Sequence, residues 1–270
     1  MKTYKRTLTI AGSDSGGGAG IQADIKTISA CCCFATSAIT AITAQNTEDV
    51  FAIHAIPPEI VEKQIQVVID DIGTDSVKIG MLNNSETTVA VKRALSKYDI
   101  NKIVLDPVMV STSGHKLLED AAIQTLIEQL FPLCHLITPN IPEAELLLGR
   151  KITSQEEFPD TVKELAEKFN LSVYLKAGHL DGDLFYDIFY HLPTKSSKIL
   201  HGKRVKTVNT HGTGCSLSSA IAAFWAKHDD INVAVEKAQQ YIQKAIFEGK
   251  DYKIGNGHGP INHFFEILNK

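Results

Sequence analysis

From Pro57 onward, stretches with helical spacing alternate regularly with short apolar runs, and this alternation restricts the fold more than any other feature of the chain. In the helical stretches, apolar residues recur on one face, as at positions 61, 65, 68, 69 and 72. The short runs are apolar throughout, which is typical of strands buried on both faces. The sequence therefore predicts an α/β fold with a central, mainly parallel sheet flanked by helices on both faces.

The same reading assigns the individual elements. Strands are predicted at residues 7–12, 35–45, 77–80, 103–105, 135–138 and 173–176. Helices are predicted from residue 21 on and at 59–72, 85–98, 117–130, 156–169, 217–225 and 233–247, with Ser85 as the N-cap of the third and a further helix opening at 139–143. Residues 187–207 are expected to form a hairpin. Because no repeat or linker interrupts the pattern, residues 1–270 are expected to form one domain.

Composition narrows the kind of partner. The formal net charge is −4 and no basic block occurs, which argues against a nucleic-acid or anionic membrane surface. No apolar run reaches the length of about 18 residues that a membrane span needs, and no secretory segment follows Met1, so we expect a cytoplasmic protein. The five cysteines include no C-x-x-C pair, and the adjacent Cys31, Cys32 and Cys33 are expected to be reduced. Small molecules are the expected partners.

A glycine-rich turn precedes the small apolar run at 217–225. Gly212 and Gly214, with Thr213 between them, allow successive backbone N–H groups to converge on an anion at the start of the following helix. Cys215 falls in the first helical turn, where the helix dipole is expected to lower the pKa of a thiol toward ~3.5–7.5. A glycine cap beside an inert core cysteine explains the turn equally well on its own.

A second glycine-rich stretch follows the first strand, at residues 12–20. It fails the dinucleotide fingerprint, which needs glycine at Ile21, and the Walker A pattern, which needs lysine at Gly18. We interpret it as a place where a ligand approaches the backbone, with a lid or linker as the alternative. Asp24, near the start of the next helix, could simply favour the helix dipole. Gln45 ends a strand and is a candidate reader of a substrate's hydrogen-bonding edge.

Polar residues also follow several predicted strands, namely Asp106, Asn140, Glu143 and Lys176. The carboxyl ends of parallel strands form one edge of a sheet, so these side chains should meet near the glycine–cysteine turn. Two carboxylates and an amide beside an anion site suit Mg²⁺ carrying a polyphosphate. Singly, each has a local explanation, because Asp-Pro is common in turns and Asn-x-x-Glu caps helices. Their joint placement favours phosphoryl transfer.

Seven motifs occur in an order and spacing that resemble one known family. They are AGSD at 11–14, GGAGIQAD at 17–24, TAQNT at 43–47, KIGML at 78–82, LDPVM at 105–109, TPNIPEA at 138–144 and NTHGTGC at 209–215. Together they resemble the hydroxymethylpyrimidine/phosphomethylpyrimidine kinases of thiamine biosynthesis, and the resemblance spans nearly the whole chain. The sequence departs from the family pattern at Ser15-Gly16, Thr112 and Ala177.

The resemblance implies a ribokinase-like fold, a homodimer, and ATP with Mg²⁺ as the cofactors. It implies that Gln45 binds the pyrimidine, that Asp106 and Glu143 serve the metal, and that Cys215 is the catalytic base. The other implied positions are Gly12, Asp24, Met81 and Val108 around the ring, Asn140 and Lys176 at the nucleotide phosphates, and Gly212, Thr213 and Gly214 as the anion hole.

The resemblance leads us to expect an ATP-dependent kinase that phosphorylates 4-amino-5-hydroxymethyl-2-methylpyrimidine and then its monophosphate. A pyridoxal or pyridoxine kinase is the chemical alternative, because those vitamins also carry a hydroxymethyl group on an aromatic ring. A nucleotide- or vitamin-binding protein without catalytic activity is the alternative from another class, since a fold does not fix a function.

Overall fold

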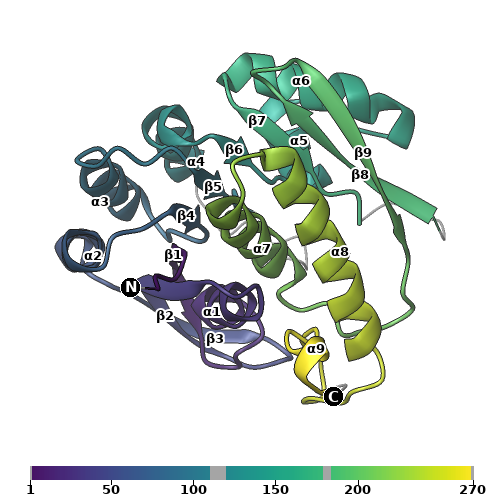
Figure 1. Ribbon diagram of the computed structural model, residues 1–270, viewed down its shortest axis with the longest axis horizontal. Coiled ribbons are helices and arrows are strands. Elements are labelled where there is room, and N and C mark those ends of the chain that lie inside the picture. The colour runs from purple at the N-terminus through teal and green to yellow at the C-terminus, as the bar shows by residue number, and fades with distance from the viewer. Residues whose placement is uncertain (1, 110–119, 179–183, 269–270) are drawn as a thin grey trace.

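A nine-stranded sheet runs through the part of the chain that the computed structural model describes, residues 2–109, 120–178 and 184–268 (Figure 1). Its order is β3-β2-β1-β4-β5-β6-β7-β8-β9. The strands are β1 Arg6–Asp14, β2 Phe34–Gln45, β3 Val50–Ala55, β4 Ser76–Ile79, β5 Ile103–Leu105, β6 Leu136–Ile137, β7 Ser172–Leu175, β8 Leu184–His191 and β9 Ser196–Lys203. The six strands from β2 to β7 in this order run parallel. Edge strand β3 pairs antiparallel with β2, and β8 pairs antiparallel with both β7 and β9.

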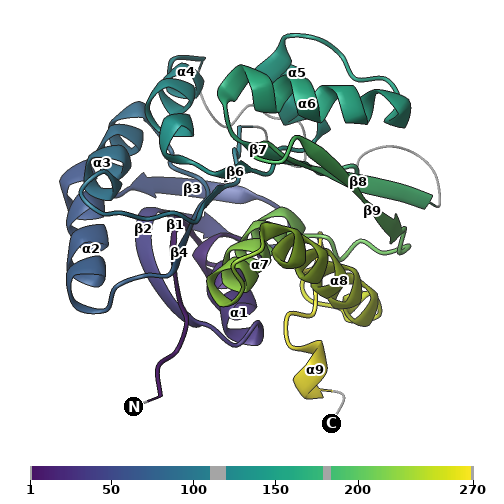
Figure 2. The ribbon, with the colours of Figure 1, turned by 45° about the horizontal axis from the view of Figure 1, so that its top comes forward.

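Helices cover both faces of the sheet, as Figure 2 shows. One layer holds α1 Gly20–Ala30, α7 Thr213–Lys227 and α8 Ile231–Gly249. The other holds α2 Pro58–Asp71, α3 Ser85–Leu95, α4 Asp120–Gln129, α5 Ile141–Leu148 and α6 Phe158–Phe169. Short 3-10 turns occur at η1 Phe131–Leu133 and η2 Gln155–Glu157, and α9 Phe265–Leu268 follows α8. None of the helices in the described residues is long and apolar enough to cross a lipid bilayer.

Alternate residues of the central strands enter two separate cores. In β5, Ile103 and Leu105 pack with the layer of α2 to α6, whereas Val104 between them packs with α7 and α8. Burial on both faces explains why these strands are apolar throughout. The expected fold class, a mainly parallel sheet with helices on both faces, is confirmed.

Three local features differ from the sequence-based expectations. Edge strand β3 was not expected: most of its residues are exposed, and a turn organised by Asn46 connects it to β2. Asn84, not Ser85, caps α3, because its side chain accepts the N–H of Thr87. Helix α9 was also missed. Thr112 and the first residues of the helix expected at 117–130 lie outside the described residues.

Candidate active site

The glycine–cysteine turn forms the amino end of α7, as the sequence predicted. Gly212 is the N-cap, with φ of 78°, and a Cβ atom there would overlap the carbonyl oxygen of Gly18. Only glycine therefore fits, both for its backbone conformation and for the close approach of the other glycine-rich loop. The hydroxyl of Thr213 donates to the carbonyl of Thr210 at 2.6 Å and fixes the entry to the helix. Residues Gly212 to Gly214 thus stand at the positive end of the α7 dipole.

The strand-end residues meet beside this turn. Asp106 follows β5 and is 2% exposed, and its Oδ1 accepts a charged hydrogen bond from Lys176 Nζ at 2.7 Å. Glu143 Oε2 lies 3.9 Å from the same ammonium group. A Cβ atom on Gly214 would lie 3.4 Å from Lys176 Nζ, so the turn packs directly on the cluster. The expectation that these elements share one edge of the sheet agrees with this geometry.

In this cluster the carboxyl groups of Asp106 and Glu143 both lie close to the ammonium group of Lys176. Burial raises the pKa of Glu143 to about 7, with Lys176 opposing and Asp106 adding to the shift. Burial disfavours the charged form of Lys176, but Asp106 and Glu143 outweigh it and raise its pKa. A cation with bound phosphate would compensate these carboxylates in the same way as the lysine.

Asn140 and Glu143 also form a capping box at the start of α5. Asn140 Oδ1 accepts the N–H of Glu143 at 2.9 Å, and Glu143 Oε2 accepts the N–H of Asn140 at 2.8 Å. The capping explanation therefore applies alongside any ligand role. Within the described residues, no group of three or more His, Cys, Asp or Glu side chains could hold a metal. Two carboxylates suit Mg²⁺, which keeps water and substrate phosphate as its other ligands.

Cys215 is half-buried between the starts of two helices, and its sulfur accepts the backbone N–H of Gly20 at the start of α1. Burial raises the pKa of the thiol to about 11; Lys78 and the Gly20 N–H oppose this shift, and Asp24 and Asp106 increase it. The lowered pKa expected from the helix dipole is therefore wrong for the ligand-free protein. Desolvation and two nearby carboxylates outweigh the partial charge of the helix end.

Asp24 lies beneath Cys215 in a buried ion pair. Its carboxylate accepts Lys78 Nζ at 2.8 and 2.9 Å, Thr9 Oγ1 at 2.6 Å and Ser219 Oγ at 2.7 Å. Asp24 and Lys78 are both 0% exposed. This corrects the expectation that Asp24 contacts the ring, because its carboxylate is inaccessible and fully engaged by these partners. Lys78 within the otherwise apolar strand at 77–80 is a sequence sign of a buried ion pair, because a lysine is almost never fully buried without a negatively charged partner.

Asp14 organises the first glycine-rich loop. Its carboxylate accepts backbone N–H groups of Gly16, Gly18 and Ala19 at 2.7–3.0 Å, and the ring of His211 at 3.0 Å. A Cβ atom on Gly18 would overlap the His211 ring. The loop is thus held against the anion-binding turn, and Asp14 and His211 are site residues that the sequence analysis missed. An aspartate directly before a glycine loop is a recognisable sign of such side-chain capping.

The remaining predicted substrate residues lie around the same loop. Gln45 ends β2, is half-buried, and contacts both Thr43 and His211. A Cβ atom on Gly12 would lie 2.6 Å from the Met81 methyl group, so the β1 backbone and Met81 are in contact. Val108 is half-buried two residues beyond Asp106. Gln45, Gly12 and Met81 therefore lie next to the loop that Cys215 contacts.

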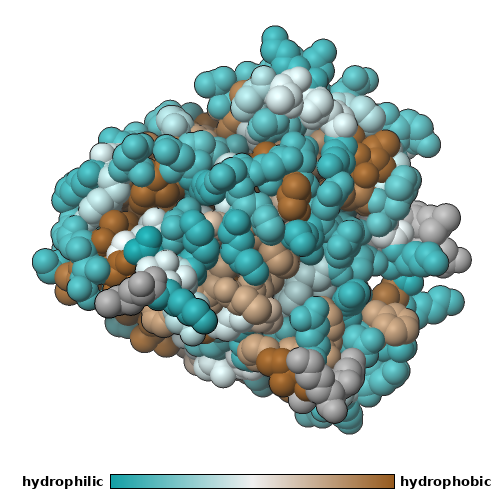
Figure 3. Space-filling view, in the orientation of Figure 1, coloured by the Kyte–Doolittle hydropathy of each residue, from teal (hydrophilic) through white to brown (hydrophobic). Residues whose placement is uncertain are grey.

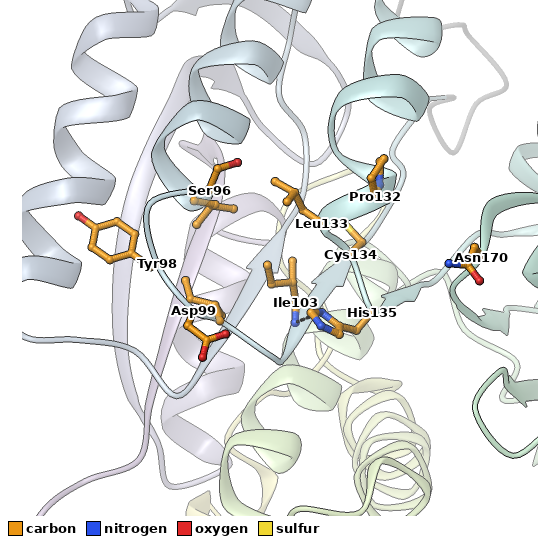
Figure 4. A pocket seen from close by; sticks show the side chains of 11 residues that line it. Ser96, Tyr98, Asp99, Ile103, Pro132, Leu133, Cys134, His135 and Asn170 are labelled. Atoms are coloured by element: carbon orange, nitrogen blue, oxygen red, sulfur yellow. Dashed lines mark hydrogen bonds between the residues drawn. The ribbon is translucent and has the colours of Figure 1, made fainter.

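One hollow in the described residues lies away from this cluster. It measures about 440 Å³ and is lined by Ile103 and His135 at the amino ends of β5 and β6 (Figure 4). That end is opposite the edge that carries Asp106 and Lys176. In open α/β sheets ligands bind at the carboxyl ends of strands, so we assign the chemistry to the Asp106 edge.

Together, the parallel sheet, the anion-binding turn and the carboxylate–lysine cluster define a phosphotransferase acting on a small molecule. Residues 14–262 match the sequence profile of the phosphomethylpyrimidine kinase family. The chain is 42% identical over 264 residues to the hydroxymethylpyrimidine/phosphomethylpyrimidine kinase of Bacillus subtilis, covering 98% of this chain and 96% of that protein. The chain belongs to the phosphomethylpyrimidine kinase family.

Two further similarities bear on the activity. The chain is 44% identical over 256 residues to a thiamine biosynthesis bifunctional protein of Geobacter sulfurreducens, covering 95% of this chain but 51% of that protein. The chain thus spans about half the length of that relative. A crystal structure of a Bacillus subtilis pyridoxal kinase in complex with ADP matches with a TM-score of 0.89 at 30% identity, covering 98% of this chain and 100% of that one.

Proposed function

We propose that the protein transfers the γ-phosphoryl group of ATP to the hydroxymethyl oxygen of 4-amino-5-hydroxymethyl-2-methylpyrimidine, and then to the resulting monophosphate. One observation carries the proposal. Two glycine-rich loops in direct contact connect three parts of the site. These parts are Gln45, which would bind the pyrimidine, Cys215, the candidate base, and the Asp106–Lys176 cluster. A kinase for a small aminopyrimidine alcohol needs these three parts within one substrate length.

Each residue has a role in the transfer. Cys215 first ionises and releases its proton to water; the substrate hydroxyl then attacks the γ-phosphorus, its proton passes to the Cys215 thiolate, and ADP leaves. The N–H groups of Gly212 to Gly214 and the ammonium of Lys176 stabilise the negative charge that develops on the phosphoryl oxygens. Asp106 and Glu143 would hold Mg²⁺, which supplies charge neutralisation on the polyphosphate when bound. A thiol whose pKa is about 11 becomes a strong base once it ionises, and ligands that neutralise Asp106 favour that ionisation.

The test is an assay of ADP release with the aminopyrimidine, its monophosphate and pyridoxine as acceptors. We expect turnover of the first two and conversion of the monophosphate to the diphosphate under excess ATP. Cys215→Ala should lower kcat by ~10²–10⁴-fold with little change in nucleotide affinity, because a positioned base contributes at that level. Wild-type kcat in this variant would exclude Cys215 as the base, and faster turnover of pyridoxine would assign the protein to the vitamin B6 substrates.

The pyridoxal kinase alternative is favoured by one observation, the similarity to the ADP-bound pyridoxal kinase. Gln45 argues for the pyrimidine. Its amide offers an acceptor and a donor, which match an exocyclic amine and the adjacent ring nitrogen. Pyridoxine has no such amine. Gln45→Leu should remove most of a preference that we expect to be roughly ten-fold to a hundred-fold in kcat/KM.

The metal role has a separate test. Removing one carboxylate weakens a site for a hard cation, so Glu143→Gln should raise the magnesium concentration needed for half-maximal activity. Glu145→Gln is the matched control, because Glu145 lies on the same helix and binds Lys151 at 2.7 Å away from the cluster. An unchanged magnesium requirement in Glu143→Gln would leave Glu143 as a capping residue alone.

A second copy of the chain is the partner that we propose for the edge of the sheet. β2 and β3 expose Ile42, Val50, Phe51 and Ile53, of which Phe51 is 68% exposed. On the face drawn in Figure 3, hydrophilic residues predominate and hydrophobic ones lie in separate patches. Phe51→Lys should shift the protein from dimer to monomer in analytical ultracentrifugation; a monomeric wild type would refute the dimer.

We also propose that the protein functions in the cytoplasm, because its five cysteines are free thiols, as expected in a reducing compartment.

A further inference from the structure

The terminal amide of Gln45 contacts two side chains whose hydrogen-bonding roles can be assigned. The structure places Gln45 Nε2 3.4 Å from His211 Nε2, and Gln45 Oε1 3.2 Å from Thr43 Oγ1. The oxygen and nitrogen of an amide exchange places when the group rotates by half a turn, so only the donors and acceptors around it decide which atom is which. Thr43 and His211 provide that information.

His211 donates through Nε2. The Asp14 carboxylate, 3.0 Å from this nitrogen, already accepts three backbone N–H groups. Burial of Asp14 opposes ionisation, yet the hydrogen bonds from His211 and the loop backbone lower its pKa, so it is a pure acceptor at neutral pH. An acceptor needs a donor opposite it. The hydrogen of the imidazole therefore sits on Nε2 whether the ring is neutral or charged.

Thr43 accepts from the amide. Its hydroxyl has one hydrogen, and the carbonyl oxygen of Ser13, which can only accept, lies 2.9 Å from Oγ1. With that hydrogen donated to Ser13, Oγ1 presents lone pairs to Gln45. The group of Gln45 that faces Thr43 must then be the NH₂, and the group that faces the N–H of His211 must be the carbonyl oxygen. One orientation of the amide satisfies both neighbours.

We infer that Thr43 and His211 lock the Gln45 amide half a turn from its placement in the structure, with Oε1 on the His211 side and Nε2 on the Thr43 side. Gln45 then binds its substrate in one direction only. The inference rests on the proposed function for the identity of the substrate. Oε1 keeps a lone pair, and Nε2 keeps a hydrogen, for a ligand. Gln45 therefore offers an acceptor and a donor in a fixed order.

This order sets which part of the substrate reaches Cys215. In 4-amino-5-hydroxymethyl-2-methylpyrimidine, the amine stands between ring nitrogen N3 and the carbon that bears the hydroxymethyl group. When the amine pairs with Oε1 and N3 with Nε2, the hydroxymethyl group extends to the His211 side. His211 directly precedes Gly212, the N-cap of α7, and Cys215 lies in the first turn of that helix, so the hydroxymethyl group extends to the side of the site where α7 begins. The reversed amide would accept the ring turned over, with the hydroxyl on the Thr43 side.

Thr43 and His211 are thus positioning residues for substrate orientation, and Thr43 gives the sharper test. Thr43→Val removes the oxygen that contacts the Gln45 amide while leaving the side-chain volume nearly unchanged. Thr43→Ser keeps this oxygen and is the matched control. The readout is kcat/KM for the aminopyrimidine and for 5-hydroxymethyl-2-methylpyrimidine, the analogue without the amine.

We expect Thr43→Val to lower kcat/KM for the aminopyrimidine roughly ten-fold while leaving the analogue little changed, and Thr43→Ser to behave like the wild type. An equal loss on both substrates in Thr43→Val would mean that Thr43 only supports the fold and would overturn the inference. So would an unchanged preference in that variant.

A measurement on the ligand-free wild type separates this inference from the proposed function. Long-range ¹H–¹⁵N correlation of the histidine rings should show a protonated Nε2 at His211, and nuclear Overhauser contacts should join the Gln45 NH₂ to the Thr43 methyl group. An unprotonated Nε2, or contacts from the NH₂ to the His211 ring instead, would overturn the lock. A wild type that shows these signals but does not turn over the aminopyrimidine would refute the proposed substrate, and with it the directional reading of that substrate.

Discussion

The reactivity of Cys215 toward iodoacetamide should depend steeply on pH in the ligand-free protein. Only the thiolate is alkylated, and burial raises the pKa of this thiol to about 11. About one molecule in 10⁴ then carries the thiolate at pH 7 and about one in 10² at pH 9, so the rate constant at Cys215 should rise about 100-fold over this range. A pKa near 7, as the helix position alone suggests, would give only about a two-fold rise.

The assay is the rate of labelling of each cysteine peptide, followed by mass spectrometry in a pH series. Cys32 is exposed and serves as the internal reference, whereas Cys31, Cys33 and Cys134 are buried and should label slowly. Cys215→Ala should abolish the corresponding labelled peptide and leave the Cys32 rate unchanged. A Cys215 rate that reaches a plateau near pH 7 would refute the argument that desolvation and the neighbouring carboxylates dominate the helix dipole.

Three further predictions concern stability and the anion turn. Lys78→Met leaves the Asp24 carboxylate in the core without its positive partner and should lower the free energy of unfolding by about 3–5 kcal/mol in urea titrations. Adding Asp24→Asn should recover part of this loss. An effect below about 1 kcal/mol, which is typical of an exposed ion pair, would contradict the argument from burial. Gly212→Ala should reduce kcat/KM far more than Gly149→Ala. Both glycines have φ above 70°, but only Gly212 lies against another loop, at Gly18. Equal effects of the two variants would show that backbone strain alone matters. Burial lowers the pKa of His263 from 6.5 to about 4, so between pH 6.5 and about pH 4 the unfolded chain binds a proton that the folded chain does not. The free energy of unfolding should therefore fall by on the order of 3 kcal/mol as the pH is lowered through this range. In His263→Gln the urea midpoint should decline less steeply with falling pH.

The sequence predicted the sheet because its strands are apolar on both faces, and the edge residues because each follows such a strand. Asp106, Glu143 and Lys176 were placed from strand ends alone, and the structure brings them together. The pKa of Cys215 could not be predicted, because it depends on Asp24 and Lys78, which approach α7 only in the folded chain.

The roles of His211 and Thr43 also depend on contacts between distant segments. The bond from His211 to Asp14 spans 197 residues of sequence, and no local pattern announces it. Thr43 lies two residues from Gln45, but its orientation toward Ser13 and Gln45 follows from the pairing of β1 with β2. Such side-chain networks follow from tertiary packing, whereas strands and helix starts follow from local spacing.

The meeting of the two glycine-rich loops also has a consequence for synthesis of the chain. Ribosomes add about 5–20 residues per second, so about 10–40 s separate the completion of Asp14 from that of His211. During this interval β1 can pair with β2 and β4, but the loop after it has no partner across the site. A ribosome-bound chain that ends before residue 211 would hold its sheet without an anion-binding turn. Catalytic competence should therefore appear abruptly and late in translation, well after most of the sheet has been made.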